Sequence, residues 1–147
     1  MLTPPAQVAI SMAQHLGAPA TPVVAKGDKV LVGQVIGEPA GFISGFVHSS
    51  VSGTVAAVEP RADIAGNMVP HVVVNVEGDE WEPSIDRTAT VVRDMTATKG
   101  EILAKVKAAG IVGMGGATFP THVKLNPPEG KNAEFLIING AECEPYV

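Results

Sequence analysis

Residues 23–58 read VVAKGDKVLVGQVIGEPAGFISGFVHSSVSGTVAAV, and β-branched residues alternate there with turn signals. Gly27 and Gly33 each lie between apolar positions, where glycine can take the positive φ of a tight turn. This pattern predicts several short strands with frequent reversals. A glycine-led turn followed by apolar residues at 27–32 recurs at 53–58, which favours two similar halves packed face to face.

The strand pattern extends outward to residue 76, because the apolar run at 72–76 predicts a closing strand. We therefore interpret residues 1–76 as a small β-sandwich. Residues 77–96 are polar and contain Pro83, which is typical of a linker on the surface. Their acidic residues are most simply interpreted as a solvated face.

The hydrophobic period changes after this linker. Thr98 and Glu101 have the spacing of a capping box, and a later glycine supplies a C-terminal stop, so a helix is predicted at 99–109. A Gly-rich loop, a short helix and a buried apolar strand at 135–138 follow. Residues 97–147 are therefore predicted to be the incomplete beginning of an α/β domain.

Composition excludes several classes of function. The 147 residues suit about one domain, and the net charge of −5 argues against binding to nucleic acid. The one cysteine, Cys143, excludes an intramolecular disulfide, a four-thiolate zinc site and an iron–sulfur cluster held by this chain alone, and it fits a reducing intracellular compartment. The N-terminus lacks a basic region and no run of about 18 apolar residues occurs, so we expect neither a secretory signal nor direct membrane insertion.

The densest chemical signal is the sequence GMGGATFP at residues 113–120. Its glycines let the backbone approach a ligand, and successive N–H groups can point at an anion. Pro120 suits the first turn of the short helix, and Lys124, one turn later, can reach a phosphate. The loop is no dinucleotide fingerprint, because Thr118 stands where the third glycine would be, and no Walker loop occurs. A tight turn and a ligand cradle both remain open, and five lysines against two glutamates in residues 97–131 favour the cradle.

A second candidate ligand segment is NGAECEP, which follows the predicted strand at 135–138. Asn139 can present its amide to a heterocycle, and Glu142 can accept a hydrogen bond from an N–H group or a ribose hydroxyl. The alternative is an Asn-Gly turn with exposed acids. The acids beside Cys143 disfavour its thiolate, and the four histidines lie more than twenty residues apart, so we assign no catalytic residue and no metal site.

Both halves of the sequence resemble one family. Residues 14–58 resemble the barrel-sandwich hybrid module at the front of the C subunit of the Rnf electron-transport complex (RnfC), and residues 108–147 resemble the start of its flavin domain. The second stretch is also similar to the flavin-carrying NADH-oxidising subunit of respiratory complex I. The implied fold class is mainly β: a lipoyl- and biotinyl-like β-sandwich followed by a truncated α/β flavin-binding domain. No lysine occurs between Lys29 and Lys99, so we expect no lipoyl or biotin on the hairpin and interpret the sandwich as a rigid docking element.

The resemblance also implies a set of cofactor-binding residues, namely Gly113, Gly115, Gly116, Lys124, Asn139 and Glu142. In this interpretation the glycines supply backbone contacts to FMN and the lysine pairs with its phosphate. The asparagine and the glutamate approach the flavin or an incoming nicotinamide nucleotide. The complex I relatives carry an acidic residue where this chain has Ala141, which is a departure from their nucleotide site.

The function implied by the resemblance is electron transfer. Such a subunit passes electrons between NAD(H) and ferredoxin-side carriers in an ion-translocating membrane complex, as a cytoplasmic, peripheral protein on the inner face of the cell membrane. Two [4Fe–4S] clusters are expected only in a C-terminal part beyond this sequence, so we expect a fragment that is not catalytic alone. The alternatives are a non-catalytic docking or adaptor module and a related soluble flavoprotein of cobalamin or proline metabolism.

Overall fold

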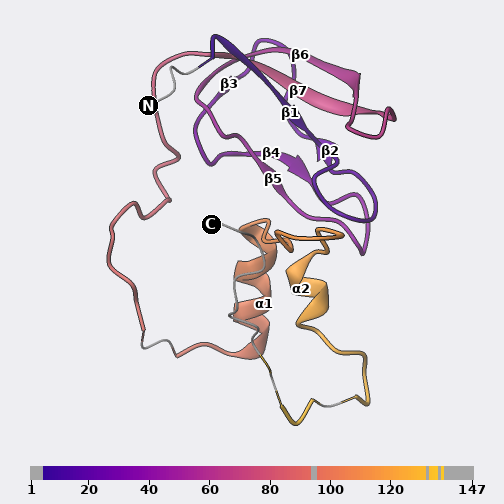
Figure 1. Cartoon of the computed structure of the whole chain (residues 1–147). Helices are drawn as coiled ribbons and strands as arrows, with labels where there is room; N and C mark the ends of the chain where they lie inside the picture. Colours follow the sequence, from indigo (N-terminus) through magenta and orange to yellow (C-terminus); the bar gives the residue numbers. More distant parts are fainter. Residues whose placement is uncertain (1–4, 94–95, 132, 136, 138–147) are drawn as a thin grey trace, which may run out of the picture.

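The computed structural model describes residues 5–93, 96–131, 133–135 and 137, and it confirms the mainly β fold class (Figure 1). A two-layered β-sandwich stands above two helices, and a long connection joins them along one side. The strands are β1 (Gln7–Ser11), β2 (Thr21–Pro22), β3 (Lys29–Val30), β4 (Val35–Glu38), β5 (Val47–His48), β6 (Gly53–Ala62) and β7 (Met68–Val76). The helices are α1 (Lys99–Ala108) and α2 (Thr121–Lys124).

The sandwich consists of two antiparallel sheets. The larger has the strand order β1-β7-β6-β3 and the smaller has the order β2-β4-β5. Gly27 and Gly33 take positive φ values of 98° and 81°, which confirms the predicted turns. The two similar stretches, residues 27–32 and 53–58, do not pack face to face as expected. Strand β3 lies beside β6 in one sheet, with Val30 opposite Gly53. The two similar stretches are therefore hydrogen-bonded neighbours.

The core lies between the two sheets and is built mainly from valine, isoleucine and methionine. Its fully buried members include Met12, Ile36 and Val74. On β7, Val72 and Val74 belong to this core, as expected for a strand whose alternate residues face the other layer. A second sheet is needed to cover this apolar face, which is why the short strands β2, β4 and β5 fold over it.

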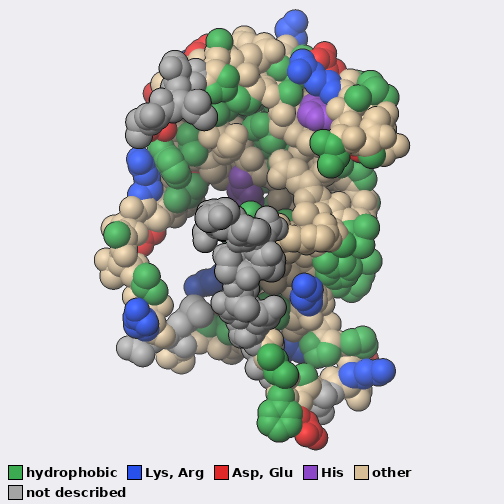
Figure 2. Space-filling view, in the orientation of Figure 1, with side chains coloured by type: hydrophobic (Ala, Val, Ile, Leu, Met, Phe, Trp, Pro, Cys, Tyr) green, Lys and Arg blue, Asp and Glu red, His purple; other side chains and the backbone are tan. Residues whose placement is uncertain are grey.

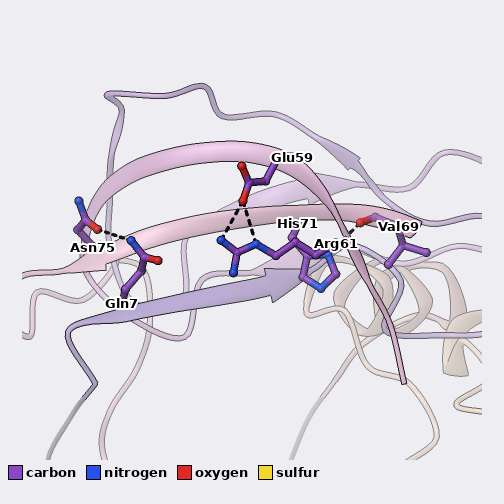
Figure 3. Close-up of polar contacts among 6 residues, drawn as sticks. All are labelled: Gln7, Glu59, Arg61, Val69, His71 and Asn75. Atoms are coloured by element: carbon purple, nitrogen blue, oxygen red, sulfur yellow. Dashed lines mark hydrogen bonds and ion pairs between the residues drawn. The ribbon is translucent and has the colours of Figure 1, made fainter. Parts of the chain in front are cut away.

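The opposite face of the larger sheet carries polar pairs (Figure 3). The Gln7 side-chain amide donates to Asn75 Oδ1 at 2.8 Å across β1 and β7, and Arg61 pairs with Glu59 at 2.8 Å on β6. The ring Nδ1 of His71 lies 2.9 Å from the carbonyl oxygen of Val69. The Gln7–Asn75 and Arg61–Glu59 pairs lie at the surface, so we assign them a small stabilising role, whereas His71 is buried.

The chain that follows β7 first packs against the sandwich and only then runs away from it. Trp81 forms a parallel bridge with Val32, and the N–H of Glu82 donates to the Val32 carbonyl at 2.9 Å. The Arg87 guanidinium stacks over the Trp81 ring at 4.2 Å from its centroid. The first part of the predicted linker is thus tied to the sandwich by backbone hydrogen bonds.

Helix α1 begins at Lys99, as predicted, and both hydrogen bonds of the capping box between Thr98 and Glu101 are present. It ends at Ala108, one residue before the predicted end. The predicted buried strand at 135–138 is wrong at Phe135 and Ile137, which lie outside any strand and are 83% and 88% exposed, while its other two residues lie outside the described part. A strand needs a neighbour for its backbone groups, and within the described residues every named strand belongs to the sandwich.

Replacing Gly53 with alanine should destabilise the sandwich strongly. Gly53 has a φ of 150°, and an added Cβ would overlap the carbonyl oxygen of Asn75 on β7. Gly66 at the hairpin tip is a matched control, because its φ is 85° but nothing lies within 4 Å of an added Cβ. We expect Gly53→Ala to lower the free energy of unfolding by about 3 kcal/mol or more and Gly66→Ala by about 1 kcal/mol. Urea unfolding measures both, and equal losses would contradict the steric explanation.

Candidate functional site

The Gly-rich segment forms a closed loop between α1 and α2. Val112 and Pro120 pair as an isolated antiparallel bridge. The N–H of Gly113 donates to the Phe119 carbonyl at 3.0 Å, and the N–H of Thr121 donates to the Ile111 carbonyl at 3.0 Å. These bonds close the base of the loop and leave residues 114–118 as its tip.

The tip presents backbone donors to its surroundings. Within the described residues, the N–H groups of Gly115, Gly116 and Ala117 donate to no acceptor. All three residues are exposed, and nothing lies within 4 Å of a Cβ added to Gly115 or Gly116. Gly113 differs from the other two glycines, because its N–H is already used at the base of the loop. Adjacent free N–H groups beside open space are what an anion-binding loop requires.

Thr118 has an unusual backbone conformation. Its φ is 49°, and it is the one non-glycine residue with a positive φ in the described part of the chain. A left-handed conformation costs an L-residue about 1–2 kcal/mol, and a β-branched side chain is particularly unsuited to it. The sequence already held a signal here, since a dinucleotide fingerprint would place a glycine at this position. Strain of this kind concentrates at functional loops.

Helix α2 places Lys124 after the loop. Pro120 is buried and is the N-cap residue, not the first helical residue as predicted. Its carbonyl accepts from the N–H groups of Val123 and Lys124. Because the N–H of Thr121 is bonded to Ile111, the first donor of α2 is not free for a ligand. Lys124 itself is exposed, so its ammonium is accessible from solvent.

One end of the sandwich contacts the loop through two segments, residues 15–18 and 43–48, which we call the platform. The N–H of Leu16 donates to the Thr118 carbonyl at 3.4 Å. A Cβ added to Gly45 would lie 3.9 Å from the Val112 side chain. The platform thus lies against both limbs of the Gly-rich loop. Sequence periodicity held no signal for this contact, because the two segments are irregular and distant from the loop along the chain.

Gly110 allows this close approach. It follows α1 with a φ of 64°, and an added Cβ would lie 2.5 Å from the Phe46 carbonyl oxygen and 3.3 Å from the His48 ring. The residue predicted as a helix stop therefore has a second role, which is to let the end of α1 pack against β5. Only glycine satisfies both the dihedral angle and the space.

A cavity of about 730 Å³ lies beside this contact and not at the loop tip. In Figure 2 an opening is visible beneath the sandwich, beside the long connection that follows β7. The lining of the cavity comes from β4 and β5, from the linker and from the end of α1, and it includes His48, Glu82 and Ala108. None of the candidate cofactor-binding glycines lines this cavity, so it is separate from the tip of the Gly-rich loop.

The remaining predicted site residues are placed as follows. Asn139 and Glu142 lie outside the described residues, as does Cys143, to which we assign no role. Over the part of the chain that the structure describes, no group of three or more His, Cys, Asp or Glu side chains is arranged to hold a metal ion. Gly115, Gly116 and Lys124 therefore lie on one short segment of the chain, which contacts the platform through Thr118.

The two layers and their strand order define a barrel-sandwich hybrid, here joined to a Gly-rich loop. Residues 1–79 match the sequence model of the RnfC barrel sandwich hybrid domain, and residues 106–147 match that of the Nuo51 FMN-binding domain. The first match covers more than half of the chain, and the chain belongs to the RnfC family.

Curated relatives agree with this assignment. The chain is 52% identical over 97% of its length to the C subunit of the Na(+)-translocating ferredoxin:NAD(+) oxidoreductase complex of Acetobacterium woodii, and it covers 32% of that protein. It is 42% identical to the C subunit of the proton-translocating ferredoxin:NAD(+) oxidoreductase complex of Clostridium ljungdahlii, over 97% of this chain and 31% of the relative. It is 45% identical to the C subunit of the ion-translocating oxidoreductase complex of Rhodobacter capsulatus, over 97% of this chain and 27% of the relative. The chain thus spans about a third of the length of these relatives or less.

The helices show no membrane span. Among the described residues, neither α1 nor α2 has the length and apolar character needed to cross a bilayer.

Acidification should weaken the contact between α1 and the sandwich through His48. Burial lowers the pKa of His48 below its ordinary value of 6.5, and a backbone contact with Ala108 partly opposes this. The unfolded chain therefore takes up the proton first, so the free energy of unfolding falls as the pH drops below 6.5 and is regained above it. We expect His48→Gln to lose less stability than the wild type when thermal unfolding is followed from about pH 8 to about pH 5.

The comparison at high pH serves as the control, because histidine is neutral there in both states and any difference reflects packing alone. His122 adds a loss of the same sign in both proteins, since burial first and then the positive charges of Lys107 and His15 lower its pKa. Parallel pH profiles for wild type and variant would show that His48 does not carry the effect.

Proposed function

We propose that residues 106–147 contribute the phosphate-binding part of an FMN site. The observation that carries this proposal is the row of N–H groups at the exposed residues Gly115, Gly116 and Ala117, which lack an acceptor within the described residues, with nothing within 4 Å of a Cβ added to either glycine. The match of the same residues to the Nuo51 FMN-binding domain supports it. A phosphate needs several converging donors, and a glycine-rich loop supplies them without side chains in the way.

The residues present fit this cofactor. The tip amides would hold the phosphate oxygens, and the Lys124 ammonium would add a positive charge from α2. FMN, when bound, supplies the exchange between two-electron and one-electron transfer. Gly113 would act differently from the other glycines, because its N–H bonds to Phe119 and so maintains the shape of the loop. Asn139 and Glu142 would approach the flavin ring or a nicotinamide nucleotide.

The rest of the proposal concerns the protein of which this chain forms part. Its role would be that of the RnfC protein, passing electrons between NAD(H) and ferredoxin-side carriers in an ion-translocating membrane complex. The names of the relatives and their greater length support this. Two [4Fe–4S] clusters would belong to the remaining length, and the protein would lie on the cytoplasmic face of the membrane. Residues 1–76 would form the sandwich module, 77–96 the linker and 97–147 the first part of the flavin domain.

The test is an FMN titration of residues 1–147 joined to the remaining length of the Acetobacterium woodii relative. We expect Lys124→Ala to raise the dissociation constant for FMN about tenfold, because it removes one charge-assisted contact to the phosphate. Quenching of flavin fluorescence measures the affinity. Lys131→Ala is the matched control, since Lys131 is also exposed and follows α2, and we expect a change below about twofold.

Two outcomes would contradict the proposal. One is a joined protein that carries no yellow colour after unbound FMN has been removed. The other is a flavin affinity that Lys124→Ala leaves unchanged, because the lysine would then have no contact with the phosphate.

A further inference from the structure

We propose that the platform of the β-sandwich holds the Gly-rich loop in its anion-binding shape, and that the bond from the Leu16 N–H to the Thr118 carbonyl is the latch. This inference rests on the proposed function for its link to flavin. The latch itself concerns only residues that the structure describes. In this proposal the sandwich is a positioning element for the Gly-rich loop of the same chain.

The first argument is the conformation of Thr118. A φ of 49° is unfavourable for threonine, so the surrounding structure must hold it. Its N–H donates to the Gly115 carbonyl at 3.4 Å, which closes the turn that contains the free amides. If Thr118 relaxed to a negative φ, this turn would open and the amides of Gly115 and Gly116 would change direction.

The second argument is that the platform contacts both limbs of the loop. The Leu16 bond of 3.4 Å is long for an N–H···O bond and does not hold the loop alone. At the base of the loop, Gly110 fits against the Phe46 carbonyl, and Val112 lies next to Gly45. The base is therefore anchored by close packing, and the latch holds the other limb at the strained residue.

The third argument is that the platform is itself rigid around Leu16. His15 is buried, and its Nε2 accepts from the N–H of Gly45 at 2.9 Å. The proton is then on Nδ1, which donates to the Leu16 carbonyl at 3.2 Å. The Ser44 hydroxyl donates to the Ala18 carbonyl at 2.8 Å and ties the two platform segments together. The Leu16 side chain is half exposed, so the part of this residue that acts is its backbone N–H.

The test measures backbone amide exchange in the full chain without flavin. Leu16→Pro removes the donor, and Leu16→Ala keeps it as the matched control. We expect Leu16→Pro to speed exchange of the Gly113 and Thr118 amides, which are hydrogen-bonded within the loop, about tenfold, with Leu16→Ala within about twofold of wild type. Protection of β6 and β7 in the same samples reports whether the sandwich is intact.

The Thr118→Gly variant distinguishes a bond that holds the loop conformation from a bond that only stabilises the sandwich. Glycine adopts a positive φ without strain, so Thr118→Gly should make the loop independent of the latch. We expect Leu16→Pro to change loop exchange less than about twofold in the Thr118→Gly background. An unchanged loop in Leu16→Pro, or the same acceleration in both backgrounds, would overturn the proposal.

A second variant decides the matter if Leu16→Pro unfolds the sandwich. Gly110→Ala removes the close fit to Phe46, and Gly130→Ala is its control, with a φ of 78° and nothing within 4 Å of an added Cβ. Faster exchange of the Gly113 and Thr118 amides in Gly110→Ala alone supports the platform, and unchanged exchange overturns it.

Flavin affinity is measured separately, in the protein joined to the Acetobacterium woodii sequence. We expect Leu16→Pro to weaken FMN binding and Thr118→Gly to restore it in the double variant. If the joined wild type binds no FMN while the exchange pattern holds, the proposed function fails and the latch stands. If FMN binds and the exchange pattern is absent, the latch fails alone.

Discussion

The pairing of β6 with β7 is the interaction on which the rest of the structure depends. Their register runs from Gly53 opposite Val76 to Ala62 opposite Met68, and it leaves one free edge on each strand. Strand β1 occupies the free edge of β7, and β3 occupies that of β6. The same hairpin supplies Val55, Val72 and Val74 to the core, each worth about 1.5–3 kcal/mol when fully buried. Without it, neither the larger sheet nor the apolar surface that the smaller sheet covers would exist.

The sandwich has a consequence beyond its own stability. Its end loops form a surface that fits the end of α1 and the Gly-rich loop, and the fit at the end of α1 depends on glycine at position 110. A barrel-sandwich hybrid without a lysine at its hairpin can therefore still have a structural role toward the loop it contacts. A rigid module can hold a neighbouring ligand loop in place, which a swinging arm cannot do.

Predictions from the sequence are confirmed where the structure depends on interactions between neighbouring residues. The turns at Gly27 and Gly33 and the capping box at Thr98 depend on a few adjacent residues, and the structure confirms them. The prediction that residues 27–32 and 53–58 belong to halves packed face to face is wrong, because similarity between two stretches does not say whether they pack across layers or pair within one sheet. The strand predicted at 135–138 failed at Phe135 and Ile137 because apolar character alone does not provide a strand with a partner.

The sequence by itself determined the mainly β class and the start of α1, which follow from composition and spacing. It also determined the family and the glycines that leave the amides at 115–117 unobstructed, which follow from specific strings of residues. Only the tertiary structure decided that Gly113 uses its N–H to close the loop, that Thr118 is left-handed, and that Leu16 and Phe46 lie against the segment. The physical reason is distance along the chain. About a hundred residues separate Leu16 from Thr118, and no pattern of neighbouring side chains records a contact that exists only after the sandwich has closed.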